Sequence, residues 1–153
     1  MGFLELKVPP PVVAAAIAVA MYLTRKWMPD PHFDFPARVP IAVIVAAAGI
    51  ATDLAGLWAF RRHRTTVNPL QPGKAATLVA DGVYRWTRNP MYLGLLLILT
   101  SWAIWLSTMV SLLGLPLLAI YLTRFQILPE ERVLRAKFGS DWTDYERHVR
   151  RWL

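Results

Sequence analysis

The chain lacks cysteine altogether, and only 18% of its 153 residues are charged. Without cysteine, the protein can have no disulfide scaffold, no thiolate metal site and no cysteine nucleophile. A soluble domain has about 25% charged and about 45–50% apolar residues, whereas 56% of this chain is apolar. Composition therefore excludes a disordered chain, and the length indicates a single domain over residues 1–153.

Charged residues are missing from three stretches that are as long as membrane-spanning helices. The stretches are residues 8–24, residues 39–60 apart from Asp53, and residues 89–123. A helix rises about 1.5 Å per residue and the hydrocarbon core of a bilayer is about 30 Å thick, so a span needs roughly 17–25 residues. The first two stretches therefore predict one span each.

The third stretch is too long for one span, because as a single helix it would be about 50 Å long. We predict a hairpin of helices 90–106 and 109–128 that turns near Ser107 and Thr108. The predicted fold is an all-α integral membrane protein with four transmembrane helices, of which the last two form this short hairpin. Amphipathic helices are expected to follow at the C-terminus.

Two other interpretations of the apolar stretches were considered. A soluble four-helix bundle needs a polar stripe on every helix, and residues 93–106 have none. A cleaved signal peptide over residues 8–24 needs a basic N-terminal region, but Glu5 offsets Lys7. The flanking Arg25, Lys26 and Trp27 are typical of an interfacial anchor, which favours a span.

Lysine and arginine are distributed unevenly between the two predicted sides of the membrane. The N-terminal tail has one, the first loop three, the loop of residues 61–88 six, the hairpin turn none, and the chain from Arg124 onwards seven. Cytoplasmic segments are enriched in these residues, so both termini and the 61–88 loop are predicted to be cytoplasmic. In a bacterium this membrane would be the plasma or inner membrane. The net charge of +7 thus orients the protein and does not indicate a nucleic-acid partner.

The cytoplasmic tail, residues 129–153, is predicted to form amphipathic helices. Pro129 in a first turn, followed by two glutamates, suits the positive end of a helix dipole. Gly139 is expected to end the first helix, and Asp141 to cap the second. Apolar residues recur at helical spacing: Val133, Leu134, Phe138, Trp142, Tyr145 and Val149.

The start of the third predicted span has the features of an anion site. Asparagine is a strong N-cap residue and proline favours the first helical position, so Asn89 and Pro90 predict a helix start. The amides of Met91 and Tyr92 then lack intrahelical acceptors, and Arg88 adds a positive charge. The same residues also fit a capped helix start with an interfacial arginine that binds no ligand.

Glu130 and Glu131 follow the fourth predicted span, and the hairpin brings them to the same side of the membrane as Asn89. A helix start that binds anions would then face a pair of carboxylates. That arrangement suits a zwitterionic ligand with a carboxylate and an ammonium group. Taken alone, the two glutamates would also fit a solvated helix start.

Residues 82–94 read G-V-Y-R-W-T-R-N-P-M-Y-L-G. They resemble the G-x-Y-x-x-x-R-H-P-x-Y-x-G signature of the isoprenylcysteine carboxyl methyltransferase family, to which phospholipid N-methyltransferases are related. The run E-E-R-V-L from Glu130, followed by Phe138, Gly139, Trp142 and Tyr145, is similar to that family's E-E-x-x-L…F-G-x-x-Y-x-x-Y ending. The resemblance covers about half of the chain.

The resemblance implies an integral-membrane methyltransferase that uses S-adenosylmethionine, with S-adenosylhomocysteine as the product. The implied cofactor-binding residues are Ala76, Thr77, Leu78, Val79, Tyr84, Asn89, Pro90, Met91, Tyr92, Glu130 and Glu131. The family's motif histidine is Asn89 here, which carries no proton near neutral pH. A family arginine near the substrate carboxylate aligns with Gln126, and Arg124 is a nearby substitute. Arg124 and Gln126 are the expected substrate-binding residues.

The expected reaction is methyl transfer to a lipophilic carboxylate, thiol or amine at the cytoplasmic membrane surface. No catalytic residue is assigned, because His32, His63 and His148 are scattered and fit surface or interfacial positions. They supply no ligand pair at i, i+3 or i+4, so neither a metal nor a haem is expected. Asp53 is the only acid inside a predicted span, and it fits either a substrate cavity or a structural role.

Two alternative functions remain. The first is an NADPH-dependent membrane reductase of sterol-reductase-like architecture, for which Arg61, Arg62 and Arg64 offer charge but no glycine-rich phosphate loop is present. The second is a non-enzymatic membrane module that binds lipid.

Overall fold

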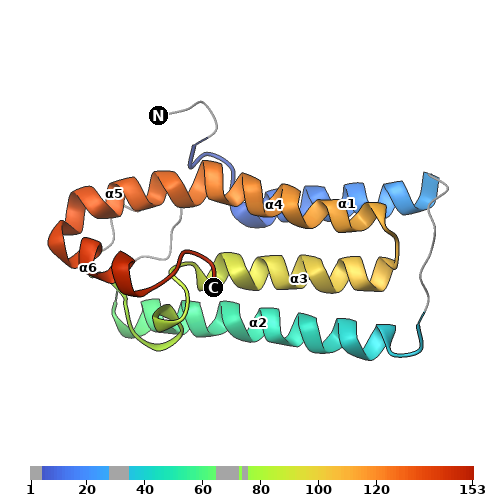
Figure 1. The fold of residues 1–153 in the computed structure, drawn as a ribbon, viewed down its shortest axis with the longest axis horizontal. Helices are drawn as coiled ribbons and strands as arrows, with labels where there is room; N and C mark the ends of the chain where they lie inside the picture. The colour runs from blue at the N-terminus through green and yellow to red at the C-terminus, as the bar shows by residue number, and fades with distance from the viewer. Residues whose placement is uncertain (1–4, 28–34, 65–72, 74–75) are drawn as a thin grey trace.

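The computed structural model describes residues 5–27, 35–64, 73 and 76–153, and these form an all-α fold (Figure 1). The elements in chain order are α1 (Pro10–Trp27), α2 (Arg38–Arg62), η2 (Gly82–Arg85), α3 (Pro90–Leu106), η3 (Val110–Leu113), α4 (Gly114–Leu122), η4 (Thr123–Ile127), α5 (Leu128–Phe138) and α6 (Ser140–His148). The predicted all-α class is confirmed. His32, Lys74 and most of the segment between residues 65 and 75 lie outside the described residues.

Helix α3 lies at the centre of the fold, with α2 on one side and α1 and α4 on the other (Figure 1). The core is built where α1, α3 and α4 meet, and Ala103, Leu106, Leu118 and Leu122 are fully buried there. Ile17 and Met21 of α1 pack into the same cluster. The apolar character of α3 on all sides follows from this central position.

Helix α2 packs on α3 through small residues and turns its large apolar residues outward. A Cβ atom at Gly49 would lie 2.8 Å from the carbonyl oxygen of Gly94, and one at Gly56 would lie 2.8 Å from Cγ of Met91. Small residues allow such close approach, as at helix contacts in membranes. The large exposed apolar side chains of α2 are Val39, Ile41, Val43, Ile44, Ile50, Leu54 and Trp58. This is the reverse of the pattern on a soluble amphipathic helix.

The predicted hairpin turn is confirmed. Helix α3 begins at Pro90 and ends at Leu106, and Ser107 follows in the left-handed region with φ 56°. Ser107 and Thr108 are buried, so the turn is part of the packed structure. The arm that follows starts as the 3-10 turn η3 and continues into α4.

The helix of the second hairpin arm was expected to end at residue 128, and it does not break there. The helix runs without a break from Val110 to Phe138, because η4 is a π-helical turn that accommodates Pro129. Leu128 donates its amide to the carbonyl of Thr123, five residues back. Pro129 has no amide hydrogen to donate to the carbonyl of Phe125, four residues back. This carbonyl accepts a hydrogen bond from the amide of Leu6 at 3.0 Å instead.

The two amphipathic helices predicted for the tail are present as α5 and α6, and Gly139 separates them with φ 55°. Asp141 was expected to cap the second helix, and this is wrong. The N-cap position is Gly139, no side chain caps the helix, and Asp141 lies in the first turn. Because Gly139 adopts a positive φ, it ends one helix and starts the next within a single residue.

In the part of the chain that the structure describes, two helices are long and apolar enough to cross a bilayer by length and composition. They are α2, with 25 residues and a mean hydropathy of 1.9, and the continuous helix Val110–Phe138, with 29 residues and a mean hydropathy of 1.5. Helix α3 is a shorter apolar helix of 17 residues. Exposed apolar side chains on these helices suit a lipid environment.

Candidate functional site

The candidate site is built around the start of α3, where the C-terminal segment returns to the fold (Figure 1). Asn89 occupies the N-cap position and Pro90 the first helical position, as predicted, but the expected side-chain cap is wrong. The Asn89 Nδ2 atom donates a hydrogen bond to the carbonyl of Arg151 at 2.9 Å. The amides of Met91 and Tyr92 therefore face outward from a helix start without a cap from Asn89.

Pro90 and Met91 are packing residues at this helix start. Pro90 is fully buried, and both side chains lie against Gly56 of α2, at 3.4 Å and 2.8 Å from the position of a Cβ atom there. The hydroxyl oxygen of Tyr84 lies 3.6 Å from the same position. The start of α3 is thus fixed to α2 on one side, which leaves its other side to face α5.

Tyr92 connects the first turn of α3 to the first turn of α5. Its side chain is 7% exposed, and its hydroxyl donates a hydrogen bond to Oε2 of Glu130 at 3.1 Å. The sequence predicted that the helix start and the acidic pair face each other, and this contact brings Tyr92 and Glu130 together. Within the described part of the chain, no arginine or lysine forms a salt bridge with Glu130.

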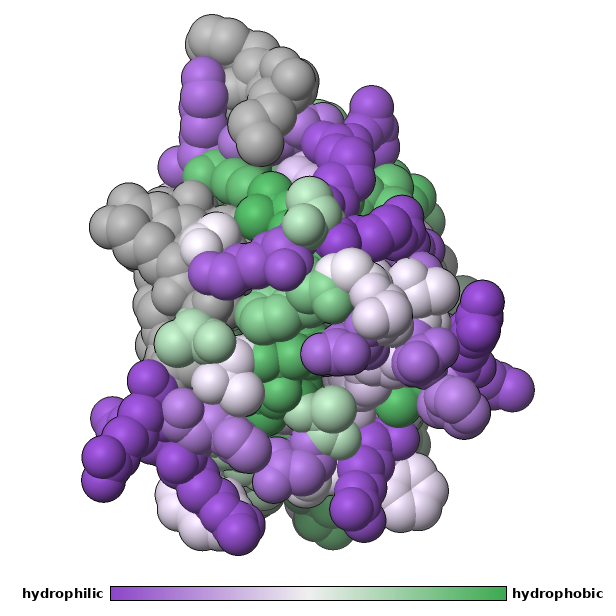
Figure 2. Space-filling view, turned by 90° about the vertical axis from the view of Figure 1, so that its left-hand side faces the viewer, coloured by the Kyte–Doolittle hydropathy of each residue, from purple (hydrophilic) through white to green (hydrophobic). Residues whose placement is uncertain are grey.

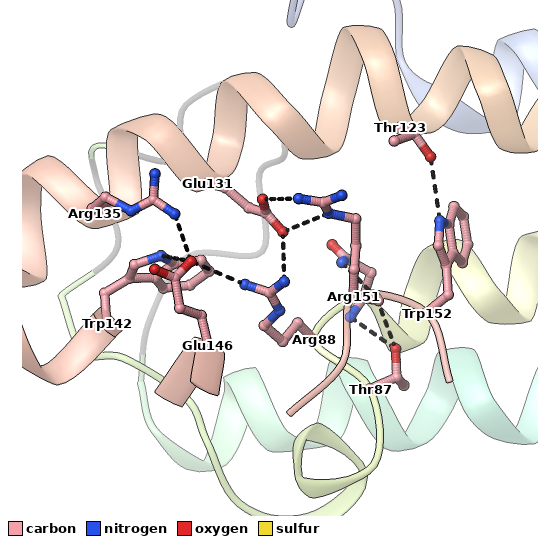
Figure 3. A network of polar contacts seen from close by, with 10 residues as sticks. Thr87, Arg88, Thr123, Glu131, Arg135, Trp142, Glu146, Arg151 and Trp152 are labelled. Atoms are coloured by element: carbon pink, nitrogen blue, oxygen red, sulfur yellow. Dashed lines mark hydrogen bonds and ion pairs between the residues drawn. The ribbon is translucent and has the colours of Figure 1, made fainter. Parts of the chain in front are cut away.

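Glu131 has a different environment from Glu130, because two arginines hold it (Figure 3). Arg151 donates from Nε and Nη2 at 2.9 and 2.8 Å, and Nη2 of Arg88 lies 3.3 Å away. The side chain of Glu131 is 6% exposed and that of Arg88 is 9% exposed. The two glutamates of the predicted pair therefore face different partners.

The same network continues to α6 through Glu146 (Figure 3). Its Oε2 atom accepts from Arg135 at 2.5 Å, from Nε1 of Trp142 at 3.2 Å and from Nη1 of Arg88 at 3.4 Å. The hydrogen bond from Arg135 is the main cause that holds the pKa of Glu146 below its ordinary value. The hydrogen bonds to Glu131 are the main cause that raises the pKa of Arg151.

The last residues of the chain lie across the start of α3. The Arg88 amide donates to the carbonyl of Arg150 at 3.0 Å, and the Thr87 hydroxyl donates to the carbonyl of Arg151 at 3.2 Å. Trp152 donates from its indole to Oγ1 of Thr123 at 3.2 Å. The C-terminal segment therefore joins the start of α3 to both η4 and α5.

Tyr84 and Val79 lie together in a small buried cluster with Ala59 of α2. Burial raises the pKa of the Tyr84 hydroxyl, and its ring meets that of Phe60 edge-on at 5.4 Å. The carbonyl of Tyr84 accepts the Tyr145 hydroxyl at 2.8 Å. The other members of the predicted 76–79 stretch are less enclosed: Ala76 and Thr77 are exposed and Leu78 is half-buried.

Arg124 and Gln126, the expected substrate-binding residues, contact the N-terminal segment. Gln126 is fully buried and donates from Nε2 to the carbonyl of Val8 at 2.8 Å. Arg124 is exposed and its Nη1 lies 3.6 Å from a carboxylate oxygen of Glu5. Among the described residues, neither forms a hydrogen bond or an ion pair with Tyr92 or Glu130.

Asp53 lies on α2 directly against Gly94 of α3. A Cβ atom at Gly94 would be 2.1 Å from Oδ1 of Asp53 and 2.7 Å from the carbonyl of Gly49. The Oδ1 atom is buried and has no hydrogen-bond partner among the described residues. Asp53 therefore lies on the α2 side of α3, whereas Glu130 lies at α5.

Sequence reasoning missed Thr87, Glu146, Arg151 and Trp152 as members of this network. From the sequence, Arg150 and Arg151 were interpreted only as positive charges that orient the protein in the membrane. Figure 2 views the end of the molecule where α5 and α6 lie, and it shows hydrophilic side chains around a band of hydrophobic ones. The network described above belongs to this mainly polar end.

Comparisons with known proteins place the chain in a family by its sequence. The sequence model of the phospholipid methyltransferase family matches residues 37–141, which include α2, α3 and both glutamates. A protein of Haemophilus influenzae, named only as an uncharacterized protein, is 44% identical over 63 residues, which are 41% of this chain and 100% of that protein. No solved structure matches the chain. The chain belongs to the phospholipid methyltransferase family.

Proposed function

We propose that the protein transfers a methyl group from S-adenosylmethionine to a lipophilic acceptor at the cytoplasmic surface of the membrane. Family membership supports the methyltransferase class and a lipid substrate. The observation that carries the proposal is the contact between Tyr92 and Glu130, which joins a helix start to a carboxylate free of arginine partners among the described residues. The acceptor group is a carboxylate, a thiol or an amine.

The residues at this site fit the amino-acid end of the cofactor. The amides of Met91 and Tyr92 lie at the positive end of α3, where a carboxylate is favoured. Glu130 would bind the ammonium group, and Tyr92 orients the carboxylate of Glu130. Glu131 is already neutralised by Arg88 and Arg151, so we assign it a structural role.

The remaining cofactor contacts are proposed from the family resemblance. Val79 and Tyr84 lie in one buried cluster beside α2, and Ala76, Thr77 and Leu78 precede them in the chain. Pro90 fixes the helix start that presents the two amides. Asn89 positions the C-terminal segment, because its side-chain amide donates a hydrogen bond to the carbonyl of Arg151. Unlike a histidine, an amide donates this bond at every pH, since it does not titrate.

The bound cofactor supplies an activated methyl group on a sulfonium centre. The chain contributes proximity and orientation, which account for much of the rate gain in a reaction of two bound partners. A carboxylate or thiolate acceptor needs no general base, whereas an ammonium group must first lose a proton. Arg124 and Gln126 are held by the N-terminal segment, which argues against an acceptor carboxylate bound as in isoprenylcysteine carboxyl methyltransferases.

We further propose that α1, α2, α3 and the arm beginning at η3 all cross the bilayer, with both termini in the cytoplasm. The outward-facing apolar side chains of α2 and the charged end formed by α5 and α6 support this orientation. The positive charge of the 61–88 loop and the tail would then face anionic headgroups. The site at the start of α3 would lie at the level of these headgroups.

Calorimetry with S-adenosylhomocysteine in detergent tests the proposal. We expect saturable binding, and no binding at high micromolar ligand would reject the cofactor. Glu130→Gln should weaken binding about 10- to 100-fold, because a charge-assisted hydrogen bond contributes roughly 1.5–3 kcal/mol. Asp141→Asn is the matched control, since Asp141 is exposed on α6. Equal affinities for the two variants would remove Glu130 from the site.

The same experiment separates the alternatives. A reductase would bind NADPH in competition with S-adenosylhomocysteine, whereas a lipid-binding module would bind neither. Labelled methyl transfer to lipophilic thiols, carboxylates and amines in parallel would then identify the acceptor group.

A further inference from the structure

An apolar groove of about 650 Å³ lies between α1 and α2, with α3 as its floor. Ligand pockets commonly have about 300–1,000 Å³, so the groove is large enough for a specific ligand. Among the described residues that line it, Ser101 is the only one with a side-chain hydroxyl, amide or charge. Two indole N–H groups are also present, from Trp102 and Trp105, and that of Trp102 donates to the carbonyl of Ala18. Such a lining has affinity for hydrocarbon and none for a charged group.

Alanines create the space. Ala14 and Ala18 of α1 line the groove together with Ala42 and Ala46 of α2. The two members of each pair are four residues apart, so they lie on one face of their helix, one above the other. Ala14 and Ala42 are buried, whereas Ala18 and Ala46 are half-buried, so a larger side chain at either of these two positions would extend into the groove.

The groove lies at the depth of a lipid chain below the candidate site. It runs along α3 from Leu95 to Trp105, which is five to fifteen residues beyond the helix start at Pro90. At 1.5 Å per residue this corresponds to a depth of about 7–22 Å. A hydrocarbon chain attached to a headgroup at the start of α3 would pass through this range of depths.

Two tryptophans line the far end of the groove. The rings of Trp102 and Trp105 stack at 4.9 Å, and the indole of Trp102 donates to the carbonyl of Ala18 at 3.0 Å. Arg25 lies over the Trp105 ring at 5.8 Å and donates to the carbonyl of Leu106 at 2.6 Å. Because these contacts fix both rings, they form a firm apolar stop.

We propose that this groove binds one hydrocarbon chain of the methyl acceptor, and that the alanines and the tryptophan stop determine which chains fit. The inference rests on the proposed function, since it assigns the groove to the substrate of that reaction. A transmembrane helix of a partner could seat only some of its side chains in the groove. Ten residues of helix, about 10 Å wide and 15 Å long, fill about 1,200 Å³, nearly twice the groove.

The test uses the full chain in nanodiscs that contain phosphatidylethanolamine with a photoreactive diazirine in the middle of one acyl chain. After illumination, mass spectrometry locates the labelled peptides. We expect labelling of the groove segments of α1, α2 and α3 in the wild type. Ala46→Phe should lower this labelling at least fivefold, because the new ring fills the groove.

Ala47→Phe is the matched control, since Ala47 is exposed on α2 and does not line the groove. It should leave the labelling of the groove unchanged. Equal labelling in both variants, or labelling spread evenly over the outer faces of the helices, would show surrounding lipid only and would overturn the proposal.

Binding of S-adenosylhomocysteine, measured on the same variants, separates the two proposals. We expect Ala46→Phe to bind it as the wild type does, because the groove and the α3 start do not share these residues. A labelled groove without this binding would reject the methyltransferase function but support a chain site. Binding without a labelled groove would reject the chain site alone.

Discussion

Arg151 and Glu131 are joined by two hydrogen bonds, at 2.9 and 2.8 Å, that connect the end of the chain to α5. Two parallel bonds of this kind fix both the distance and the orientation of the partners. Glu131 is therefore a structural anchor for the C-terminal segment, whereas its neighbour Glu130 bonds to Tyr92. Two adjacent residues of α5, Glu130 and Glu131, thus have different partners, which the sequence alone could not show.

Glu131→Gln should destabilise the protein, because Arg88 and Arg151 would lose the charge that compensates them. Removing one partner of a buried ion pair costs about 3 kcal/mol or more. For a chain of this length we expect the melting temperature to fall by roughly 6–12 °C. Thermal unfolding in detergent would measure the change, with Asp141→Asn as the exposed control. Indistinguishable melting curves for the two variants would contradict the structural role.

The pH dependence of stability should include a contribution from Glu146. Its pKa is below the ordinary 4.5 in the folded protein, chiefly because of the hydrogen bond from Arg135. The unfolded chain therefore binds the proton first as the pH falls, so the stabilisation is present above pH 4.5 and is lost below it. Melting temperatures between pH 7 and pH 3.5 would show a steeper decline for the wild type than for Glu146→Gln. If the melting temperatures of the two proteins fall in parallel, Glu146 does not contribute to the pH dependence of stability.

The sequence predicted α3 and its turn well, because the signals there are local. Asn89 and Pro90 mark the start of the helix, and Ser107 and Thr108 interrupt the apolar run at its end. The approach of Tyr92 to the acidic pair also followed from the hairpin, since its arms return to the same side.

The network at the C-terminus could not be predicted in the same way. Arg151 meets residues 20 and 62 positions away, Glu131 and Asn89, and no local pattern encodes such contacts. The side-chain cap predicted for Asn89 is wrong for the same reason. The side-chain amide of Asn89 donates instead to the carbonyl of Arg151, which is distant in the sequence. Pro129 was expected to mark a boundary, but the amide of Leu6 satisfies the freed carbonyl of Phe125 and the helix continues.

Gly94→Ala should disrupt the contact between α2 and α3. The new methyl group would lie 2.1 Å from Oδ1 of Asp53 and 2.7 Å from the Gly49 carbonyl. Overpacking of this kind costs about 1–3 kcal/mol. Adding Asp53→Ala should recover only part of the loss, because the backbone of Gly49 cannot move aside.

Gly114→Ala is the control for this pair, since the methyl group there would meet the side chain of Met21 at 2.5 Å. That flexible side chain can rotate away, so we expect a smaller loss of stability. Melting temperatures of the single and double variants would measure the differences. A Gly94→Ala protein as stable as Gly114→Ala would show that the two helices are not in close contact.

Pro129→Ala should loosen the N-terminal segment while leaving the helix intact. Alanine restores an amide that can bond to the carbonyl of Phe125, so it competes with the amide of Leu6. A hydrogen bond contributes about 1 kcal/mol, which corresponds to roughly fivefold faster hydrogen exchange at Leu6. Exchange measured by mass spectrometry on the N-terminal peptide would detect this. Pro116→Ala in α4 is the control and should leave the rate unchanged, whereas equal rates in the wild type and Pro129→Ala would show that Leu6 is held by other contacts.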